Sequence, residues 1–522
     1  MMGRIVPVAG CAAAAALLLL GCAEGEGPHG GDDGGAGQDA SVWWPEITEP
    51  EPPASPAPPE LPRMTPCPEG WREKVDPDDA ALVTCDPWPE GGRQDCAEDE
   101  AHFPGRPRCE RIGPPCPEGE WPAEIPEDAR VLYVRAGEPA GGDGTRERPL
   151  GRIADAVAAA DDGDVIALSK GVFDEEVWID RAVLLLGACV LETRIAPSGA
   201  GPAAVTLRAA AVVRDLQIGG AEVGVEMSGA AVTAVLDSVV VREATGIGVY
   251  AYLQARLEAT NLVVRETAGD TGYGLYASGA LVSLERVVID RARIRGLMIS
   301  GGVLTATDLV VSDTKGNGAF GEGLVAVGGA QVALERAVLR GNRTAGVWAF
   351  GEGTLLTAVG LLVSNTREQE SDGAAGYGIV DFGGARVTLE RAALERNHAI
   401  GVGVVGEGTE LTAADLVISD TQPQEANGML GGGVEVNRGA RVALERVIVK
   451  RNHDGGVVVT SEAVLTGTDL VVSDTDERPG DGFGGVGLEA REAAQVALER
   501  VVIERNHAIG VVAYDDGVTA RT

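Results

Sequence analysis

The chain has 522 residues, which is more than one ordinary hydrophobic core needs. Its 79 acidic residues outnumber its 43 basic residues and give a formal net charge of −36. We therefore expect neither nucleic acid nor an anionic membrane surface as a partner, because both would be repelled.

Residues 1–22 have the features of an export signal. Arg4 supplies a positive start, and the apolar run 12–20 is too short to span a membrane. The run ends in Leu19-Leu20-Gly21-Cys22, which resembles a bacterial lipobox, whose cysteine becomes the lipidated first residue. We therefore expect Cys22 to anchor an exported protein at the outer membrane or cell surface, with the lipid as its only membrane contact. The alternative is an ordinary secreted protein.

Two segments separate this signal from the rest of the chain. Residues 23–66 are rich in Gly, Asp, Glu and Pro, which predicts a disordered tether. Residues 67–122 are rich in cysteine, and an exported protein enters an oxidising compartment. We expect three disulfides, in one of fifteen possible pairings, among Cys67, Cys85, Cys96, Cys109, Cys116 and Cys189. A zinc site is the alternative, but it needs close CxxC-type pairs, which these spacings do not offer.

The segment after residue 128 resembles the entry to a solenoid. Val131-Leu-Tyr-Val-Arg-Ala-Gly137 and Gly142-Asp-Gly-Thr145 precede a short amphipathic stretch at 153–160, and Asp161-Asp-Gly-Asp-Val-Ile-Ala-Leu168 follows. These segments resemble the start of the pectate-lyase-like right-handed β-helix proteins, which implies a short cap helix at 153–160. That superfamily includes lyases, hydrolases, adhesins and non-enzymatic surface proteins, so the resemblance implies a fold rather than an activity.

The rest of the chain repeats itself. Leu-Glu-Arg followed by three apolar residues begins at 284, 334, 389, 444 and 498. A related phrase, such as Asp308-Leu-Val-Val-Ser-Asp-Thr314, lies between these copies, so each coil has about 22–24 residues and an insertion extends alternate coils to about 28–31. Short Val/Ile/Leu-rich runs between Gly, Asn, Asp and Thr are typical of strands and turns. We predict an all-β right-handed parallel β-helix solenoid over residues 128–522, with three strands per coil.

The repeated polar residues should form ladders, because stacked coils place aligned residues about 4.8 Å apart. Two ladders alternate Arg with mostly Asp, and opposite charges across a strand pair are stabilising. A third alternates Thr with Asn, whose side chains suit a turn. The first ladder is Arg286, Asp308, Arg336, Gly360, Arg391, Asp415, Arg446, Asp469 and Arg500. The second is Arg291, Asp313, Gly341, Asn365, Arg396, Asp420, Arg451, Asp474 and Arg505. The third is Thr314, Asn342, Thr366, Asn397, Thr421, Asn452, Thr475 and Asn506.

The insertions lie at 267–274, 314–323, 366–378, 421–433 and 475–487. They fall at one corner of the coils and should form one ridge, and insertions in repeats commonly map to a binding face. The candidate binding residues on this ridge are Tyr273, Phe320, Tyr377 and Phe483. The alternative is soluble decoration whose aromatic side chains fold back onto the coil.

The sequence predicts no catalytic, cofactor-binding or metal-binding residue. Polysaccharide lyases of the superfamily use Ca²⁺ held by acidic residues together with Arg or Lys, and its hydrolases use clustered Asp with His and Arg-x-Lys. Here the acidic and Arg residues lie in the ladders, and no acidic pair stands outside the repeats. His398, His453 and His507 lie on alternate coils, about 10 Å apart, which is too far to share one zinc ion.

We predict a non-enzymatic cell-surface lipoprotein whose β-helix is a binding or structural scaffold, with a polysaccharide or another envelope component as its partner. The alternative is a polysaccharide lyase or glycoside hydrolase of the same superfamily. Near the end of the chain, Val518-Thr-Ala520 resumes a coil, and no capping segment precedes Thr522. Because an open coil leaves backbone groups unpaired, we also expect self-association through this coil.

Overall fold

The computed structural model describes residues 57–522 except 200, 516–517 and 522. The predicted signal segment, Cys22 and most of the predicted tether lie outside the described residues. Within them the chain forms strands β1–β36 and one helix, α1 (Ile153–Ala159). None of the helical structure in this part of the chain is long and apolar enough to cross a membrane.

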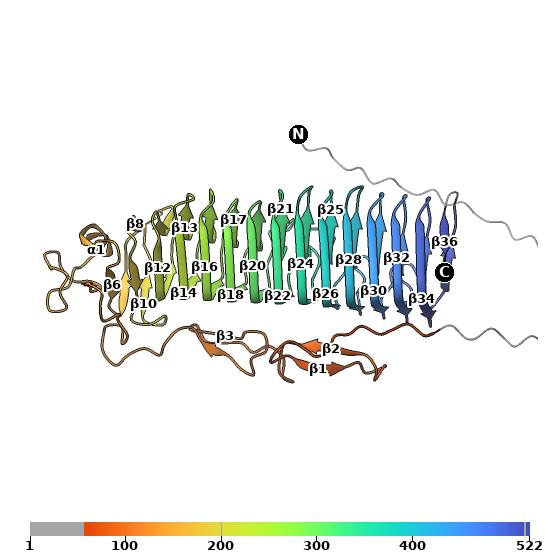
Figure 1. The fold of residues 1–522 in the computed structure, drawn as a ribbon, viewed down its shortest axis with the longest axis horizontal. Coiled ribbons are helices and arrows are strands. Elements are labelled where there is room, and N and C mark those ends of the chain that lie inside the picture. Colours follow the sequence, from red (N-terminus) through yellow and green to blue (C-terminus); the bar gives the residue numbers. More distant parts are fainter. Residues whose placement is uncertain (1–56, 200, 516–517, 522) are drawn as a thin grey trace, which may run out of the picture. The chain divides into compact units, whose positions relative to one another are not determined.

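Two parallel sheets wind together into a right-handed β-helix, as predicted (Figure 1). The 14-stranded sheet contains β8 (Val177–Ile179), β11 (Ala203–Leu207), β13 (Val223–Ser228), β15 (Ile247–Tyr252), β17 (Tyr273–Ser278), β19 (Arg295–Ser300), β21 (Leu324–Val327), β23 (Ala345–Phe350), β25 (Tyr377–Phe382), β27 (Ile400–Val405), β29 (Gly432–Asn437), β31 (Gly455–Val459), β33 (Val486–Ala490) and β35 (Ile509–Ala513). The 18-stranded sheet contains β5 (Val131–Val134), β6 (Val165–Leu168), β7 (Gly171–Phe173), β9 (Leu184–Leu186), β10 (Thr193–Ile195), β12 (Ala211–Gly219), β14 (Thr233–Arg242), β16 (Arg256–Arg265), β18 (Leu281–Asp290), β20 (Val303–Ser312), β22 (Gln331–Arg340), β24 (Leu355–Ser364), β26 (Arg386–Glu395), β28 (Glu410–Ser419), β30 (Arg441–Lys450), β32 (Val464–Ser473), β34 (Gln495–Glu504) and β36 (Thr519–Arg521).

A regular coil has two strands rather than the predicted three, because its longer strand is bent. The pairing of β18 with β20 runs from Leu281 to Asp290 but skips Arg286 and Asp308, whose φ angles are 56° and 55°. A residue in this left-handed conformation turns the chain while the hydrogen bonds on either side continue. Each ten-residue strand therefore supplies two straight segments. The left-handed conformation costs a residue with a side chain about 1–2 kcal/mol.

The first charged ladder lies at such bends, and the second, whose residues are also left-handed, directly follows the ends of the ten-residue strands. The structure confirms the alternation of Arg and Asp. Arg446 Nε and Nη2 donate to the two carboxylate oxygens of Asp415 at 2.6 and 3.0 Å. Arg451 binds Asp420 in the same bidentate way at 2.7 and 3.0 Å. In each pair the Arg binds the Asp of the preceding coil. Paired, charge-assisted hydrogen bonds of this kind stabilise the stack and offset the cost of the left-handed residues.

The Thr and Asn ladder lies in the next turn and is buried. Asn452 Oδ1 accepts the backbone N–H of Thr421 at 2.9 Å, and Asn397 Oδ1 accepts that of Thr366 at 3.1 Å. Inside the coils, apolar side chains from both sheets form one continuous core. At the first coils, α1 packs Ile153 and Val157 into this core and occupies the position predicted for the cap helix.

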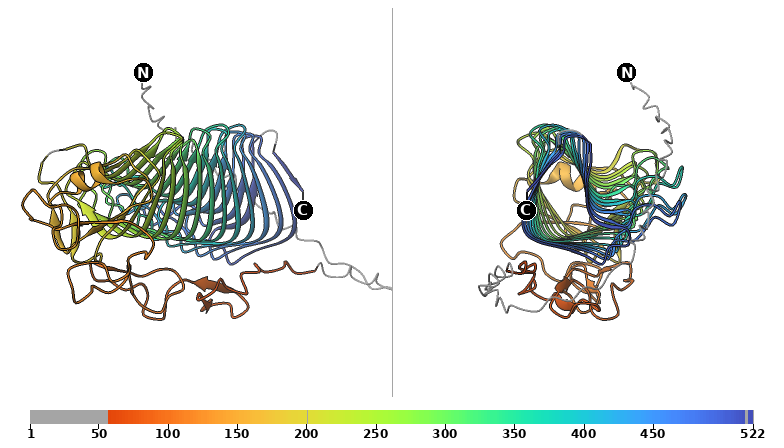
Figure 2. Two further views of the ribbon diagram at one scale, coloured as in Figure 1. Left: turned by 60° about the vertical axis from the view of Figure 1, so that its left-hand side comes forward. Right: turned by 90° about the vertical axis from the view of Figure 1, so that its right-hand side faces the viewer.

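Residues 57–122, which we call the strap, lie along the outside of the 18-stranded sheet and run against the direction in which the coils progress (Figures 1 and 2). The strap contains two short antiparallel pairs, β1 (Arg72–Val75) with β2 (Val83–Asp86), and β3 (Glu100–Ala101) with β4 (Glu110–Arg111). Backbone N–H groups of Glu60 and Arg63 donate to Asp469 and Asp415 at 3.0 and 2.8 Å. Residues 57–66 were predicted to belong to the tether but are therefore bound to the coils.

The strap covers an apolar column that the 18-stranded sheet presents on its outer surface. Val240, Val263, Val288, Val310, Val338, Leu362 and Ala393 form this column and pack against Met64, Trp71, Trp88, Phe103 and Ile112 of the strap. The middle residue of each apolar triplet in the repeats supplies the column, so this part of each strand is buried on both faces.

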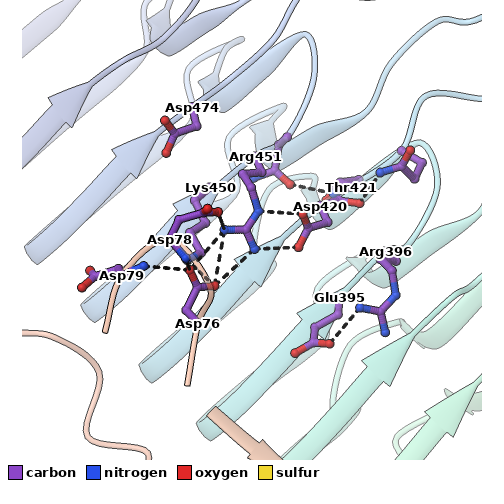
Figure 3. A network of polar contacts seen from close by, with 12 residues as sticks. Asp76, Asp78, Asp79, Glu395, Arg396, Asp420, Thr421, Lys450, Arg451 and Asp474 are labelled. Carbon is purple, nitrogen blue, oxygen red and sulfur yellow. Dashed lines mark hydrogen bonds and ion pairs between the residues drawn. The ribbon is translucent and has the colours of Figure 1, made fainter. Parts of the chain in front are cut away.

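Ion pairs fix the position of the strap along the stack (Figure 3). Asp76 lies 2.5 Å from Lys450 Nζ and 3.3 Å from Arg451 Nη2, and Asp78 lies 3.1 Å from Arg451 Nη1. Burial by itself would raise the pKa of Asp76, but the bonds from Lys450 and Arg451 outweigh it and lower that pKa to about 2. The carboxylate is therefore ionised wherever the strap is docked at ordinary pH.

Three disulfides join the six cysteines of the described residues, as predicted. They are Cys67–Cys85, Cys96–Cys109 and Cys116–Cys189. The first two lie within the strap, and the third ties its end to the early coils. Tertiary structure thus selects one of the fifteen pairings that the sequence allowed.

Candidate functional site

The outer face of the 14-stranded sheet carries most of the aromatic side chains of the β-helix. Of the 7 tyrosines in the chain, five lie in strands of this sheet. Its aromatic residues are Trp178, Tyr250, Tyr252, Tyr273, Tyr276, Trp348, Phe350, Tyr377 and Phe382. They alternate along each strand with residues that enter the core, so most of them are half-buried or exposed on the outer side.

Most of these aromatic side chains form two groups of neighbouring rings, stacked in the first group and edge-on or tilted in the second. In the first, the ring of Tyr250 lies 4.5 Å from that of Tyr252 and 5.1 Å from that of Tyr276, with interplanar angles of 19° and 13°. In the second, the ring of Phe382 lies 5.0 Å from that of Trp348 and 4.5 Å from that of Phe350. The register Tyr250↔Tyr276 and Phe350↔Phe382 places these partners on adjacent coils. The face therefore carries two clusters of rings along the axis of the stack. They are separated by the coils of β19 and β21, where Met298 and Val325 take the aligned positions.

The insertions border this face and form one ridge (Figure 2). Each connects a ten-residue strand to the next strand of the 14-stranded sheet, so all lie at the same corner. They also contact one another: Gly480 N–H donates to the Gly428 carbonyl at 3.0 Å, and Ser371 hydroxyl donates to the Gly318 carbonyl. The predicted single ridge is therefore present.

The four predicted ridge residues divide into two kinds. Phe320 and Phe483 lie in insertions, with 43% and 67% of their surface exposed. Tyr273 and Tyr377 instead begin β17 and β25 and belong to the aromatic face itself. The guanidinium of Arg295 connects the two kinds, since it lies 4.5 Å from the Phe320 ring and 5.7 Å from the Tyr273 ring.

A pocket of about 560 Å³ opens on the same face near its C-terminal end. Three carboxylates line it, those of Glu435, Asp454 and Glu489, together with Arg478, Arg491, Phe483 and Tyr514. The register Glu435↔Val458↔Glu489 places the two glutamates on alternate coils, with backbones about 10 Å apart. Asp454 lies between the two glutamates in the sequence and directly precedes β31.

The surroundings of these carboxylates differ. Burial raises the pKa of Glu435 despite the hydrogen bond from Asn437, and Asp454 raises it further. Burial also raises the pKa of Asp454, which Arg478 partly offsets at 3.5 Å. Glu489 accepts the hydroxyl of Tyr514 at 2.6 Å and lies 3.5 Å from Arg491. Burial thus raises the pKa of two of the carboxyl groups that line this pocket.

Sequence reasoning did not single out this pocket. Glu435, Asp454 and Glu489 belong to none of the ladders and line one pocket. The ladders lie within or directly after the ten-residue strands, whereas these residues lie in or beside the other sheet. The aromatic face was also missed, although Gly-Val-Tyr-Ala-Tyr252, Tyr-Gly-Leu-Tyr276 and Gly-Val-Trp-Ala-Phe350 share one pattern that could have revealed it.

The three histidines of the turns have separate partners. His398 Nδ1 lies 2.7 Å from Glu368, His453 Nδ1 lies 3.1 Å from the Thr421 carbonyl, and His507 Nε2 lies 3.5 Å from Glu477. The Glu368–His398 pair also lies beside Glu425, and these three residues could together hold a metal ion.

No family model and no curated protein matches the chain. Among solved structures it is similar to the catalytic unit of a GH87 α-1,3-glucanase from Streptomyces thermodiastaticus, with 15% identity and a TM-score of 0.38, over 76% of this chain and 71% of the other. It is also similar to pectate lyase Pel9A, with 14% identity and a TM-score of 0.22, over 75% and 81% of the chains. The Dettilon tailspike protein matches with 12% identity and a TM-score of 0.34, over 73% and 68%. The expected parallel β-helix fold is confirmed by the strand pairing of this chain itself.

Proposed function

We propose that this protein binds a neutral polysaccharide along the outer face of the 14-stranded sheet. The observation that carries the proposal is the two clusters of neighbouring rings around Tyr250 and Trp348, on one face of a regular stack. Aromatic side chains offer large rigid apolar surfaces with little entropy to lose, and the C–H faces of sugar rings pack well on such surfaces. Two clusters aligned along the axis suit an extended chain of sugars.

Charge favours a neutral polysaccharide over a polyuronate. The chain carries a net charge of −36, and the acidic residues Glu226, Glu435 and Glu489 lie on strands of the same sheet. The arginines Arg478 and Arg491 beside them are paired with Asp454 and Glu489. A polyanion would therefore meet repulsion with few free cations to offset it.

Binding can be tested on a glycan array and by co-sedimentation with insoluble neutral polysaccharides. Trp348→Ala should weaken retention by about tenfold, which corresponds to about 1.4 kcal/mol, because aromatic anchors dominate such interfaces. Leu355→Ala is the matched control, since Leu355 is an exposed apolar residue of β24 in the other sheet. Equal retention of wild type and Trp348→Ala, or preferential binding of polyuronates, would contradict the proposal.

A second candidate is hydrolysis of a glycan in the pocket of Glu435, Asp454 and Glu489. The observation in its favour is the raised pKa of Glu435 and Asp454 beside a third carboxylate, because glycosidases need one protonated and one ionised carboxyl group. Release of reducing ends that Glu435→Gln abolishes would favour hydrolysis. Release of unsaturated uronate would favour a lyase, and binding without release favours the first proposal.

We further propose that Cys22 is lipidated and holds the protein at the outer membrane or cell surface, on the strength of Leu19-Leu20-Gly21-Cys22. The Cys22→Ser protein should leave the membrane fraction or remain unprocessed. Fractionation and processing identical to wild type would contradict the anchor.

A further inference from the structure

Three successive coils bring chemically unlike side chains to one point on the ridge. Glu368 lies in the insertion at 366–378, Glu425 lies in the insertion at 421–433, and His398 lies in the short turn between β26 and β27. The potential ligand atoms of all three lie within 4.8 Å of one another. Glu368 Oε1 is 2.7 Å from His398 Nδ1 and accepts the backbone N–H of Glu425 at 2.8 Å.

The charges at this point suit a cation. The carboxyl group of Glu368 is 6% exposed and lies beside the exposed carboxyl group of Glu425. The nearby Arg343 donates to the Glu368 carbonyl at 3.0 Å and pairs with Glu370 at 2.7 Å, so its charge is already matched.

We propose that Glu368, His398 and Glu425 bind one Zn²⁺ ion. One imidazole nitrogen and two carboxylate oxygens are donors that zinc accepts at about 2.0–2.2 Å, with a fourth position left to water. Ligand atoms around such an ion are about 3.3 Å apart, so the site must contract from its present spread. The exposed side chain of Glu425 is free to make this movement. The ion would lie between Glu368 Oε1 and His398 Nδ1, which are 2.7 Å apart without it.

The other repeats supply internal controls. His507 has a carboxylate partner in Glu477, at 3.5 Å, but no third ligand from a further insertion is present among the described residues. Within the part of the chain that the structure describes, the His453 ring bonds only the Thr421 carbonyl, since Pro423 stands where Glu368 stands in the earlier repeat. One repeat of the three thus has a full ligand set. A zinc ion there would join two insertions and stiffen the border of the aromatic face.

The test is zinc stoichiometry in the purified, tag-free protein, measured by competition with a colorimetric chelator. Any free thiol outside the three disulfides is first alkylated, since it would bind zinc itself. Wild type should bind one equivalent that millimolar Ca²⁺ does not displace. His398→Ala and Glu425→Gln should each bind at least about tenfold more weakly. His453→Ala and His507→Ala should bind like wild type.

Glu425→Gln distinguishes the loss of a ligand from the loss of the fold, because this side chain is exposed. In the presence of chelator, the melting temperature of this variant should equal that of wild type. No zinc binding by wild type would overturn the proposal. So would displacement by Ca²⁺, unchanged affinity in His398→Ala and Glu425→Gln, or equal losses in His453→Ala and His507→Ala.

Discussion

Asp381 gives the sharpest test of how the coils are packed. It occupies a position of β25 whose side chain enters the core, where its neighbours on adjacent coils are Ala349 and Val404. The side chain is 0% exposed, and neither carboxylate oxygen has a hydrogen-bond partner among the described residues. Burial raises the pKa of Asp381 from 3.8 to about 8. An unpaired buried charge is costly, so this group remains protonated in the folded chain at neutral pH.

The sign of the effect on stability follows from the two pKa values. An unfolded chain releases this proton near pH 4, whereas the folded chain holds it until about pH 8. Between these values the folded state binds the extra proton, so its stability falls as pH rises, by about 1.4 kcal/mol per unit. By pH 7 the accumulated loss is about 4 kcal/mol relative to a residue that does not titrate. Above pH 8 the loss is complete and constant.

The free energy of unfolding should be measured by denaturant titration at pH 5 and pH 7. Asp381→Asn keeps the shape and removes the titration, and Asp381→Val matches the neighbouring Val404. The advantage of each variant over wild type should grow by about 3 kcal/mol between the two pH values. Asp128→Asn, at an exposed position, serves as the control and should show no such growth. An advantage that is equal at pH 5 and pH 7 would refute the placement of Asp381 in a dry core.

Other predictions concern the ladders and the strap. Asp415→Arg should lower the melting temperature by the equivalent of about 3–5 kcal/mol, because the new guanidinium group would face that of Arg446. The loss should persist at high salt, since the native pair is buried. A loss that vanishes in salt would contradict this. Replacing Cys116 and Cys189 by Ala should lower the unfolding free energy by about 4 kcal/mol, because the disulfide closes a loop of 73 residues. A strap that resists protease as well without this disulfide as with it would contradict the prediction. The lowered pKa of Asp76 contributes stability above about pH 4 that is lost as pH falls toward 2, so tryptophan fluorescence should report strap release in that range and not above it.

The sequence by itself determined the stacking of the chain. A single coil cannot bury its apolar residues, so they are buried only against neighbouring coils, and the period of Leu-Glu-Arg reveals the unit that stacks. Alternating charges then fixed the alignment, and the pairs Arg446–Asp415 and Arg451–Asp420 confirm it. The bend at each ladder position was not evident, because left-handed backbone is unusual for Arg and Asp, and only Gly360 and Gly341 hinted at it.

Only the tertiary structure decided what covers each face of the sheets. The apolar triplet around Val288 shows that a strand is buried on both sides, but the sequence does not say that the strap from residue 57 onward is the cover. Likewise, the grouping of Glu435 with Glu489, and of Glu368 with His398, joins residues on different coils, at separations that depend on the lengths of the insertions between them. Contacts within a coil follow from its own residues. Contacts between coils and with the strap depend on where the chain returns in space, which the local pattern does not encode.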